Sequence, residues 1–280
     1  MPASYGLFGY PVQQSWSPFI HGMFAKQTAQ DMEYRLFESP PERFRSEVLE
    51  FFRAGGSGIN VTVPHKRAAT DLVNELSPRA QIANAINTIL RQAEGLLGDN
   101  TDGAGLLADL TRNLRLKFSS PRILLLGAGG AARGALGPLL ELNPRLLVVA
   151  NRTAERAIEI AEEFAYLGPV SGCEFAKLEN KRFDLIVNAT SASLRGDVPA
   201  IPPGVVDSLT TCYDMAYGIG DTAFVAWAKN RGAGRAEQGW GMLVEQAAEA
   251  FFLWRGVRPD TAPVLAALHN RALRKPRSPS

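Results

Sequence analysis

The sequence is poor in the residues that build disulfide frameworks and metal centres. Its 280 residues include two cysteines, Cys173 and Cys212, which are too far apart to form a C-x-x-C motif. The three histidines, His21, His65 and His269, are scattered along the chain. We therefore predict no metal site. We expect both cysteines to be reduced thiols in the core of a cytoplasmic protein.

Long apolar runs and an excess of one charge are also lacking. No stretch approaches the roughly 18 apolar residues of a membrane-spanning helix. No basic leader followed by an apolar block is visible at the N-terminus, so we expect no secretory signal. With 30 basic and 28 acidic side chains, the net charge of +2 does not favour nucleic acid or a membrane as partner. The length and a hydrophobic fraction of 46% predict a globular protein of about two domains, and no repeats are visible.

The most informative segment is Arg122–Ala132, which reads R-I-L-L-L-G-A-G-G-A-A. Its short apolar run predicts a buried parallel strand, and a helical pattern follows from Ala131 to Leu142. Strand, glycine turn and helix in this order are typical of dinucleotide binding. Gly127 permits the tight turn, Gly129 lets the backbone approach a pyrophosphate, and the helix N-terminus offers it free N–H groups. A glycine turn in another kind of α/β protein is the alternative.

The next predicted strand, Leu146–Ala150, ends in Asn151-Arg152-Thr153. About two dozen residues past the first glycine, an NAD enzyme carries an acid that binds the ribose 2′-hydroxyl. Here no acid is present, and Arg152 and Arg156 lie close together. A guanidinium can pair with a 2′-phosphate, so the sequence favours NADP. Alternatively, Arg152 merely ends the strand and Thr153 caps the next helix.

The N-terminal part also predicts an α/β arrangement. Strands are expected at residues 5–9, 33–37 and 59–63, and helices at 18–28 and 41–53. In the third strand Ile59, Val61 and Val63 alternate with Asn60 and Thr62, which indicates a half-buried strand with the polar residues outside. A further helix is expected at 77–85 and a hairpin about residues 94–95, followed by a helix to about residue 114.

Two hydroxyls, Ser15 and Ser17, precede the helix that opens at Pro18. Hydroxyls beside a helix N-terminus can receive a carboxylate, although Ser17 is also a good residue for capping the helix. Lys66 lies just past the strand end, where ligands bind in open α/β sheets, and Asp102 lies at a helix start. The alternatives are a solvated lysine for Lys66 and a capping or dipole-stabilising acid for Asp102.

The C-terminal part predicts strands at 184–189 and 212–215, a loop at 239–241, and helices at 222–229, 242–254 and 262–273. We expect the basic, proline-containing tail, residues 274–280, to be disordered. The domain boundary is placed in the helix and linker before Pro121. This gives one domain over 1–103, completed by 240–280, and a nucleotide-binding domain over 104–239. The side chains that offer chemistry are Lys66, Asp102, and hydroxyl and amide groups.

Eight motifs occur in order along nearly the whole chain, namely F-G-x-P-V-x-x-S-x-S-P (8–18), N-V-T-V-P-H-K (60–66), A-I-N-T (85–88), G-D-N-T-D-G (98–103), G-A-G-G-A (127–131), N-R-T (151–153), N-A-T-S (188–191) and G-M-L-V-x-Q-A (241–247). On these motifs the chain resembles shikimate dehydrogenases nearly from end to end. The resemblance implies two α/β domains. The first is a substrate domain with a mainly parallel sheet, to which the C-terminal helices return, and the second is a Rossmann-type NADP domain. It also implies NADPH-dependent, reversible reduction of 3-dehydroshikimate to shikimate in aromatic amino-acid biosynthesis.

The resemblance further assigns roles to individual residues. Lys66 and Asp102 would be the catalytic pair, with the ammonium stabilising the oxyanion that hydride delivery creates. The substrate would be held by Ser15, Ser17, Thr62, Asn87, Tyr217 and Gln246. The cofactor would be held by Gly127, Ala128, Gly129, Gly130, Ala131, Asn151, Arg152, Thr153, Thr190, Met215, Gly239 and Met242. The enzyme would act as a monomer or homodimer on a small molecule.

Three rival functions and one rival acid–base group remain at this point. The functions are a quinate/shikimate dehydrogenase with broader substrate or cofactor use, a methylenetetrahydrofolate dehydrogenase-like enzyme, and a non-catalytic nucleotide-binding module. The rival acid–base group is His65. Four residues depart from the usual pattern of the family, namely Asn84, Ser193, Ala223 and Trp240. We expect Ser193 and Ala223 to alter the nicotinamide-side loops and Trp240 to crowd the cofactor entrance.

Overall fold

A computed structural model of the chain describes residues 2–274 and divides them into two compact units. The first unit comprises the chain to Gly105 together with Leu243–Leu268. The second comprises Leu106–Met242 and the described residues from His269 onward. Each unit is built on its own six-stranded sheet, and the predicted α/β fold class is confirmed. The predicted disorder of the tail concerns residues that, apart from Arg274, lie outside the described part.

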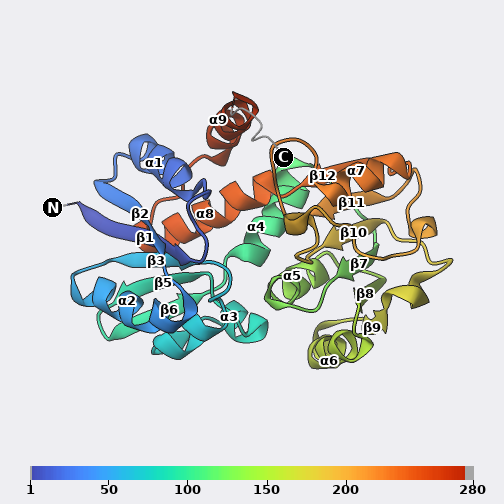
Figure 1. Cartoon of the computed structure of the whole chain (residues 1–280), viewed down its shortest axis with the longest axis horizontal. Coiled ribbons are helices and arrows are strands. Elements are labelled where there is room, and N and C mark those ends of the chain that lie inside the picture. The colour runs from blue at the N-terminus through green and yellow to red at the C-terminus, as the bar shows by residue number, and fades with distance from the viewer. Residues whose placement is uncertain (1, 275–280) are drawn as a thin grey trace. The chain divides into compact units, whose positions relative to one another are not determined.

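The sheet of the first unit has the strand order β2-β1-β3-β5-β6-β4. Figure 1 labels all of these strands except β4. The strands are β1 (Ala3–Gly9), β2 (Met32–Glu38), β3 (Gly58–Val61), β4 (Glu75–Leu76), β5 (Thr88–Gln92) and β6 (Gly95–Asp99). β1 pairs in parallel with β2 and β3, and β4 with β6, whereas β5 is antiparallel to both of its neighbours. Because only β5 is reversed, the sheet is mainly parallel, as predicted, and β5 begins where β3 ends.

Helices cover both faces of this first sheet. They are α1 (Ser17–Gln27), α2 (Pro41–Arg53), α3 (Pro78–Ala83), α4 (Asp102–Ala108), α8 (Trp240–Arg255) and α9 (Thr261–Arg274), of which α4, α8 and α9 also contribute residues to the second unit. On one face, Phe44 of α2 packs on Phe8 of β1. On the other face, Phe24 of α1 packs on Phe251 of α8. The alternation of side chains along β1 therefore produces a core on each side of the sheet.

The sheet of the second unit is parallel throughout, in the order β12-β11-β10-β7-β8-β9. Its strands are β7 (Arg122–Leu126), β8 (Leu146–Asn151), β9 (Val170–Glu174), β10 (Leu185–Asn188), β11 (Thr211–Asp214) and β12 (Arg235–Gln238). Counted from β7, this is the doubly wound order 3-2-1-4-5-6, in which the chain reverses direction across the sheet between its first and fourth strands. A nucleotide site is therefore expected beyond the carboxyl ends of β7 and β10.

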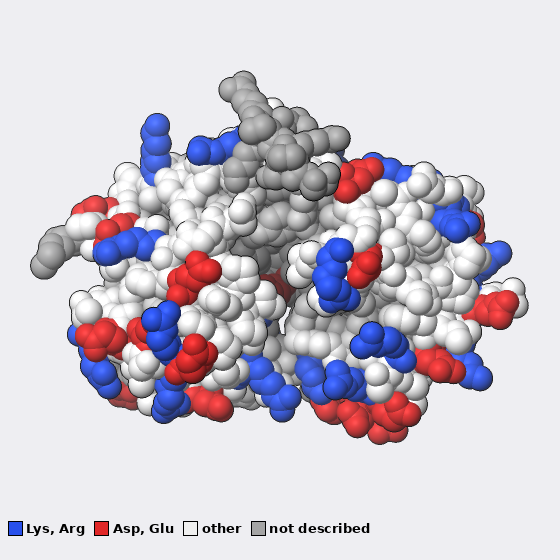
Figure 2. Space-filling view, viewed as in Figure 1, with Lys and Arg blue, Asp and Glu red and all other residues white. Residues whose placement is uncertain are grey.

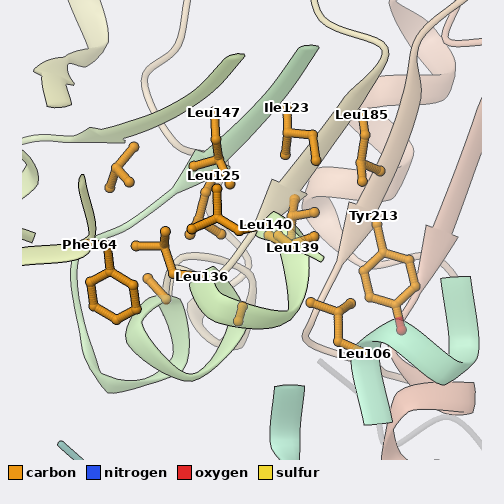
Figure 3. Packing of buried hydrophobic residues seen from close by; sticks show 14 of the residues in the cluster. Leu106, Ile123, Leu125, Leu136, Leu139, Leu140, Leu147, Phe164, Leu185 and Tyr213 are labelled. Carbon is orange, nitrogen blue, oxygen red and sulfur yellow. The ribbon is translucent and has the colours of Figure 1, made fainter. Parts of the chain in front are cut away.

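The helices of the second unit are α5 (Gly130–Leu140), α6 (Ala154–Phe164) and α7 (Ala223–Asn230), joined by residues 106–108 of α4 and the π-helical turn Asp109–Asn113. Figure 3 shows Leu136, Leu139 and Leu140 of α5 beside the β7 and β8 side chains Ile123, Leu125 and Leu147. The opposite face of the sheet packs on α7 through Phe224 and Ala228. Both faces of every central strand are thus buried, which explains their continuous apolar sequences.

Several boundaries differ from those predicted. β3 ends at Val61, so Val63 is 57% exposed whereas Asn60 is 5% exposed, and the predicted alternation with polar residues outside is wrong there. The first turn of α8 occupies part of the predicted loop 239–241, because the helix begins at Trp240. Strands β9 and β12 were not predicted. Gly172 and Gly234 interrupt the apolar pattern in and beside them, and β12 ends in charged and amide side chains.

Charges of both signs are interspersed on the face of the molecule in Figure 2, in keeping with the net charge of +2. The acidic side chains that gather over α6 in this view come from a helix with four exposed glutamates, Glu155, Glu159, Glu162 and Glu163. Among the described residues, no helix is long and apolar enough to cross a membrane. No group of three metal-ligating side chains suited to an ion occurs in that same part of the chain.

A buried histidine makes the first unit sensitive to acid. His21 of α1 is fully buried and stacks on Tyr34 of β2, with the ring centroids 4.3 Å apart. Burial lowers its pKa from 6.5 to about 3, so the imidazole is neutral in the folded protein near pH 7. The unfolded chain takes up a proton below pH 6.5 and the folded chain does not until about pH 3. Stability therefore falls as the pH drops through this window.

We predict that His21→Phe flattens the pH dependence of stability. Between pH 7 and pH 5, the free energy of unfolding of the wild-type protein should fall by about 2 kcal/mol more than that of the variant, because only the wild type carries this titration. Urea unfolding followed by tryptophan fluorescence at the two pH values measures the difference.

Phe24→Leu is the matched control, since Phe24 packs edge-on against His21 but does not titrate. It should lower the free energy of unfolding equally at both pH values. Identical pH slopes for the wild type and His21→Phe would show that His21 is not the group responsible.

Candidate functional site

The side chains of Lys66 and Asp102 meet in the first unit. Lys66 lies in the turn after β3, and its ammonium donates a short hydrogen bond to Asp102 Oδ2. The lysine side chain is 23% exposed and the aspartate side chain 10%. The solvated-lysine alternative therefore does not describe Lys66. Asp102 begins α4, so its carboxylate also lies at the positive end of a helix.

An amide holds the other oxygen of this carboxylate. Asn87, directly before β5, is 2% exposed, and its Nδ2 lies 2.8 Å from Asp102 Oδ1 and 3.2 Å from Gln246 Oε1. Its Oδ1 accepts the backbone N–H of Thr101 at 2.8 Å. Gln246 on α8 in turn donates to the carbonyl of Leu243. Four of the predicted residues, Lys66, Asp102, Asn87 and Gln246, thus form one hydrogen-bonded group.

The two serines form a pair at the start of α1. Ser15 Oγ lies 3.1 Å from Ser17 Oγ and accepts the backbone N–H of Ser17 at 3.2 Å. The N-cap position belongs to Trp16, and Ser17 is the first helical residue, so the capping role considered for Ser17 is wrong. The two hydroxyls therefore lie together at a helix N-terminus, an arrangement that suits a carboxylate.

Two further candidates lie close to Lys66 in sequence. Thr62, half-buried, directly follows β3, and its amide donates to the carbonyl of Phe8. His65 is 2% exposed, stacks on Phe44 at 4.1 Å, and has its Nε2 2.6 Å from the carbonyl of Ser39. The contacts of His65 are thus directed into the core of the first unit. They favour a packing role over the acid–base role considered for it.

The glycine turn between β7 and α5 has the backbone geometry expected of a pyrophosphate site. Gly127 has φ +106°, and a Cβ there would lie 3.2 Å from both the Ala189 carbonyl oxygen and a Thr190 methyl carbon. Gly129 is the N-cap of α5, makes no side-chain cap, and has open space where a Cβ would be. With Ala128, Gly130 and Ala131, these glycines leave the first N–H groups of an 11-residue helix open.

The residues predicted to select the cofactor end β8. Asn151 donates from its side chain to the carbonyl of Thr153 at 3.0 Å. Thr153 occupies the N-cap position of α6, but its side chain makes no capping hydrogen bond. The capping alternative is therefore correct for its position and wrong for its hydrogen bond. Arg152 is exposed and forms no ion pair with any residue between positions 2 and 274. Its guanidinium is therefore free to bind an anion.

The remaining cofactor candidates lie at the carboxyl ends of β10 and β11 and where α8 begins. The Thr190 hydroxyl donates to Asn188 Oδ1 at 2.7 Å, and the amide of Met215 donates to the Asn188 carbonyl at 3.0 Å. A Cβ on Gly239 would lie 2.5 Å from the Met215 carbonyl oxygen, so only glycine fits there. Met242 is 7% exposed and belongs to the core of the second unit.

Tyr217, predicted to bind substrate, belongs to the second unit. Its ring packs on Trp240 with a centroid distance of 4.7 Å, and burial raises the pKa of its phenol to about 12. Trp240 is 6% exposed in this contact and also meets His269 edge-on. The tryptophan therefore packs within its own unit at the start of α8.

Sequence reasoning missed several residues that support these sites. Thr101 orients Asn87, and behind Asn87 lie the polar side chains of Thr88 and Asn60, both buried. In the second unit, the missed residue is Asp214, whose Oδ2 accepts a hydrogen bond from Ser193 at 2.6 Å. A polar residue within an apolar strand, as at Asn60, was the available signal, but it was attributed to an exposed face.

Comparison with known families matches three stretches of this chain. Residues 7–89 match the shikimate dehydrogenase substrate binding domain, residues 109–195 match shikimate / quinate 5-dehydrogenase, and residues 239–269 match the shikimate 5′-dehydrogenase C-terminal domain. Together these stretches contain Lys66, Asn87, Arg152 and Gln246. Asp102 lies between the first two.

Individual relatives match over nearly the whole length. A shikimate dehydrogenase (NADP(+)) of Hahella chejuensis is 53% identical over 94% of this chain and 97% of its own. The crystal structure of an Ael1 enzyme from Pseudomonas putida is similar with a TM-score of 0.89 and 43% identity, covering 95% of this chain and 98% of that one. A Thermus thermophilus shikimate 5-dehydrogenase, solved with NADP(H) and shikimate, has a TM-score of 0.84 and 32% identity, covering 97% of this chain and all of its own.

The identity and coverage are far above what a shared fold alone requires, and they agree with the hydrogen-bonded lysine, aspartate, asparagine and glutamine of the first unit. The chain belongs to the shikimate dehydrogenase family.

Proposed function

We propose that this protein is an NADP-dependent oxidoreductase that reduces 3-dehydroshikimate to shikimate, reversibly, in aromatic amino-acid biosynthesis. The observation that carries the proposal is the paired Lys66 and Asp102 with Asn87 and Gln246 around them. These groups occur in a chain 53% identical to a shikimate dehydrogenase (NADP(+)). A nucleotide-binding module without activity has no need of a lysine–carboxylate pair held in this way.

The reaction needs a proton donor at the oxygen of the substrate ketone. When bound, the reduced nicotinamide supplies a hydride to the carbonyl carbon, and negative charge develops on oxygen. The Lys66 ammonium stabilises that charge by a hydrogen bond and supplies the proton. Asp102 holds the ammonium in place, because its Oδ2 accepts from Lys66 while its Oδ1 is held by Asn87. In the reverse direction the lysine accepts the proton of the shikimate hydroxyl.

Recognition of the substrate is assigned to hydroxyl and amide groups. Ser15 and Ser17, paired at the start of α1, donate to the ring carboxylate, with Tyr217 as a further hydroxyl for the same ligand. The ring hydroxyls are bound by Thr62, Asn87, Gln246 and the catalytic pair. The hydroxyl and amide side chains can both donate and accept hydrogen bonds, and in the catalytic pair Lys66 donates while Asp102 accepts. A polyhydroxylated ring therefore matches these groups better than an apolar ligand does.

The second unit is assigned to NADP. Residues Gly127–Ala131 would hold the pyrophosphate at the N-terminus of α5, where the open space at Gly129 leaves room for it. Asn151, Arg152 and Thr153 would bind the 2′-phosphate. Thr190, Met215, Gly239 and Met242 would line the nicotinamide. We accordingly assign the first unit to substrate and catalysis and the second to the cofactor, with the chain acting in the cytoplasm, where the free thiols Cys173 and Cys212 would remain reduced.

We predict that Lys66→Ala lowers kcat by at least about a hundredfold in both reaction directions, with a much smaller change in KM, because the proton donor is lost from the transition state. Initial rates of NADPH oxidation with 3-dehydroshikimate, and of NADP⁺ reduction with shikimate, measure this effect. Quinate and 3-dehydroquinate, assayed in parallel, define the substrate range.

His65→Phe is the control for this experiment, since His65 neighbours Lys66 but stacks on Phe44. It should retain kcat. A large rise in KM for Lys66→Ala with kcat unchanged would mean that the lysine only binds substrate.

We predict that Arg152→Gln reduces kcat/KM for NADPH about 10- to 100-fold, since a charge-assisted hydrogen bond to phosphate contributes about 1.5–3 kcal/mol. The value for NADH should stay the same or rise, because NADH lacks the 2′-phosphate. The ratio of the two values, from initial rates with each cofactor, is the measured quantity.

Arg156→Gln removes a neighbouring exposed guanidinium from the first turn of α6 and tests whether the effect is specific to Arg152. Equal loss with NADPH and NADH in Arg152→Gln would argue against recognition of the 2′-phosphate by this residue.

A further inference from the structure

A continuous line of hydrogen bonds lies behind the catalytic pair, and its members beyond Asn87 play no part in the mechanism described above. The Tyr34 hydroxyl lies 2.8 Å from Asn60 Oδ1. Asn60 Nδ2 lies 3.0 Å from Thr88 Oγ1, which lies 3.0 Å from Asn87 Oδ1. Asn87 Nδ2 then donates to Asp102 Oδ1 at 2.8 Å. These residues come from four successive places in the first unit, β2, β3, the start of β5 and the start of α4.

The direction of these bonds is fixed by backbone groups that can only donate or only accept. Asn60 Nδ2 also lies 3.2 Å from the carbonyl of Asn87, which accepts only, so the amide nitrogen must face that side. Its oxygen therefore faces Tyr34, and the phenol must donate. Thr101 N–H, which donates only, lies 2.8 Å from Asn87 Oδ1, so the Asn87 nitrogen must face Asp102.

The Thr88 hydroxyl connects these two fixed amides. Because it accepts from Asn60 Nδ2, its own proton is directed to Asn87 Oδ1. Every bond from Tyr34 to Asp102 then runs the same way, and bonds aligned head to tail polarise one another. Thr88 is fully buried and Asn60 is 5% exposed, so water does not replace a lost member without cost.

The Tyr34 end of this line of hydrogen bonds is held in place by its neighbours. Tyr34 stacks on the buried His21, with the ring centroids 4.3 Å apart. Burial raises the pKa of Tyr34 well above its ordinary value, so the phenol stays protonated and remains a donor.

We propose that Tyr34, Asn60 and Thr88 are positioning residues, which act through Asn87 to hold the Asp102 carboxylate in the orientation that Lys66 requires. The inference rests on the proposed function, since it concerns the geometry of that reaction. None of the three contacts the reacting atoms in this assignment. Their loss should therefore lower kcat, with little effect on the binding of NADP⁺.

Thr88 allows the sharpest test, because its two roles can be separated. Thr88→Val keeps the volume and removes the hydroxyl, whereas Thr88→Ser keeps the hydroxyl and removes a methyl group. The proposal expects Thr88→Val to lower kcat for shikimate oxidation roughly 5- to 20-fold, by analogy with the loss of one to two buried hydrogen bonds, and Thr88→Ser to retain most of the wild-type kcat. If Thr88 serves only in packing, the order of the two variants is reversed, and that result overturns the proposal.

Tyr34→Phe tests the member of the hydrogen-bonded line that lies furthest from Asp102, and Tyr5→Phe is its matched control. Tyr5 on β1 is the direct sheet partner of Tyr34 and also stacks on Trp254, but its hydroxyl lies near Arg255 rather than Asn60. The proposal expects Tyr34→Phe to lower kcat several-fold more than Tyr5→Phe does. Equal kcat values for the two variants would overturn the role of Tyr34, and this comparison is decisive if Thr88→Val does not fold.

Two measurements separate this proposal from the proposed function and from general instability. If the wild-type protein does not oxidise shikimate in the presence of NADP⁺, the proposed function itself is refuted. If the wild type is active and Thr88→Val and Tyr34→Phe both keep the wild-type kcat, only the positioning role of these residues is refuted. The dissociation constant for NADP⁺, measured for all variants, should follow Tyr5→Phe and Thr88→Ser, and kcat is compared at a temperature below the melting temperature of every variant. A kcat loss accompanied by an equal loss of NADP⁺ affinity would count against positioning.

Discussion

The structure of the first unit depends on satisfying one buried carboxylate. Asp102 is 7% exposed, and a charge in such a place is tolerated only when its oxygens are bonded. Lys66 and Asn87 occupy one oxygen each, and they reach Asp102 from the end of β3 and from the residue before β5. This requires β5 to run antiparallel to β3, because only a reversed strand begins where its neighbour ends. The single reversed strand of a mainly parallel sheet is thus the feature that assembles the site.

In the second unit, backbone geometry places the candidate cofactor residues. Its parallel strands all end at one edge, and the order of the strands reverses between β7 and β10. Gly127 closes the turn after β7 against Ala189 and Thr190 of the segment after β10, so any side chain there would crowd the two segments. The candidate cofactor residues lie at the carboxyl ends of five of these strands, β7, β8, β10, β11 and β12, and their positions result from topology. Side-chain identity becomes decisive only at Arg152, where charge distinguishes two otherwise similar cofactors.

The sequence was most informative where spacing alone determines structure. The glycine turn between β7 and α5, the parallel strands on either side of it, and the polar groups at strand ends were predicted and occur as expected. Prediction was wrong where tertiary contacts override local pattern. Asn60 looks like the exposed member of an alternating strand, yet it is buried because Tyr34, Thr88 and the Asn87 carbonyl, all distant in sequence, bond it. Ser17 has the sequence of an N-cap, but α1 begins a residue earlier than expected and Ser15 bonds its amide instead.

Two of the four departures from the expected family pattern are explained by backbone conformation or by a hydrogen-bond partner distant in sequence. Asn84, where the resemblance leads us to expect glycine, ends α3 with φ +47°, and asparagine is the residue other than glycine that best tolerates this conformation. Ser193, at a second position where we expect glycine, is a hydroxyl donor to Asp214, a carboxylate whose pKa is raised by burial and lowered in part by Ser193 and Thr222. Because Asn188 also donates to Asp214 while its oxygen receives Thr190, the substitution strengthens the network that positions a candidate cofactor residue. The four departures lie outside the group formed by Lys66, Asp102, Asn87 and Gln246, so none of them removes a side chain that the proposed chemistry uses.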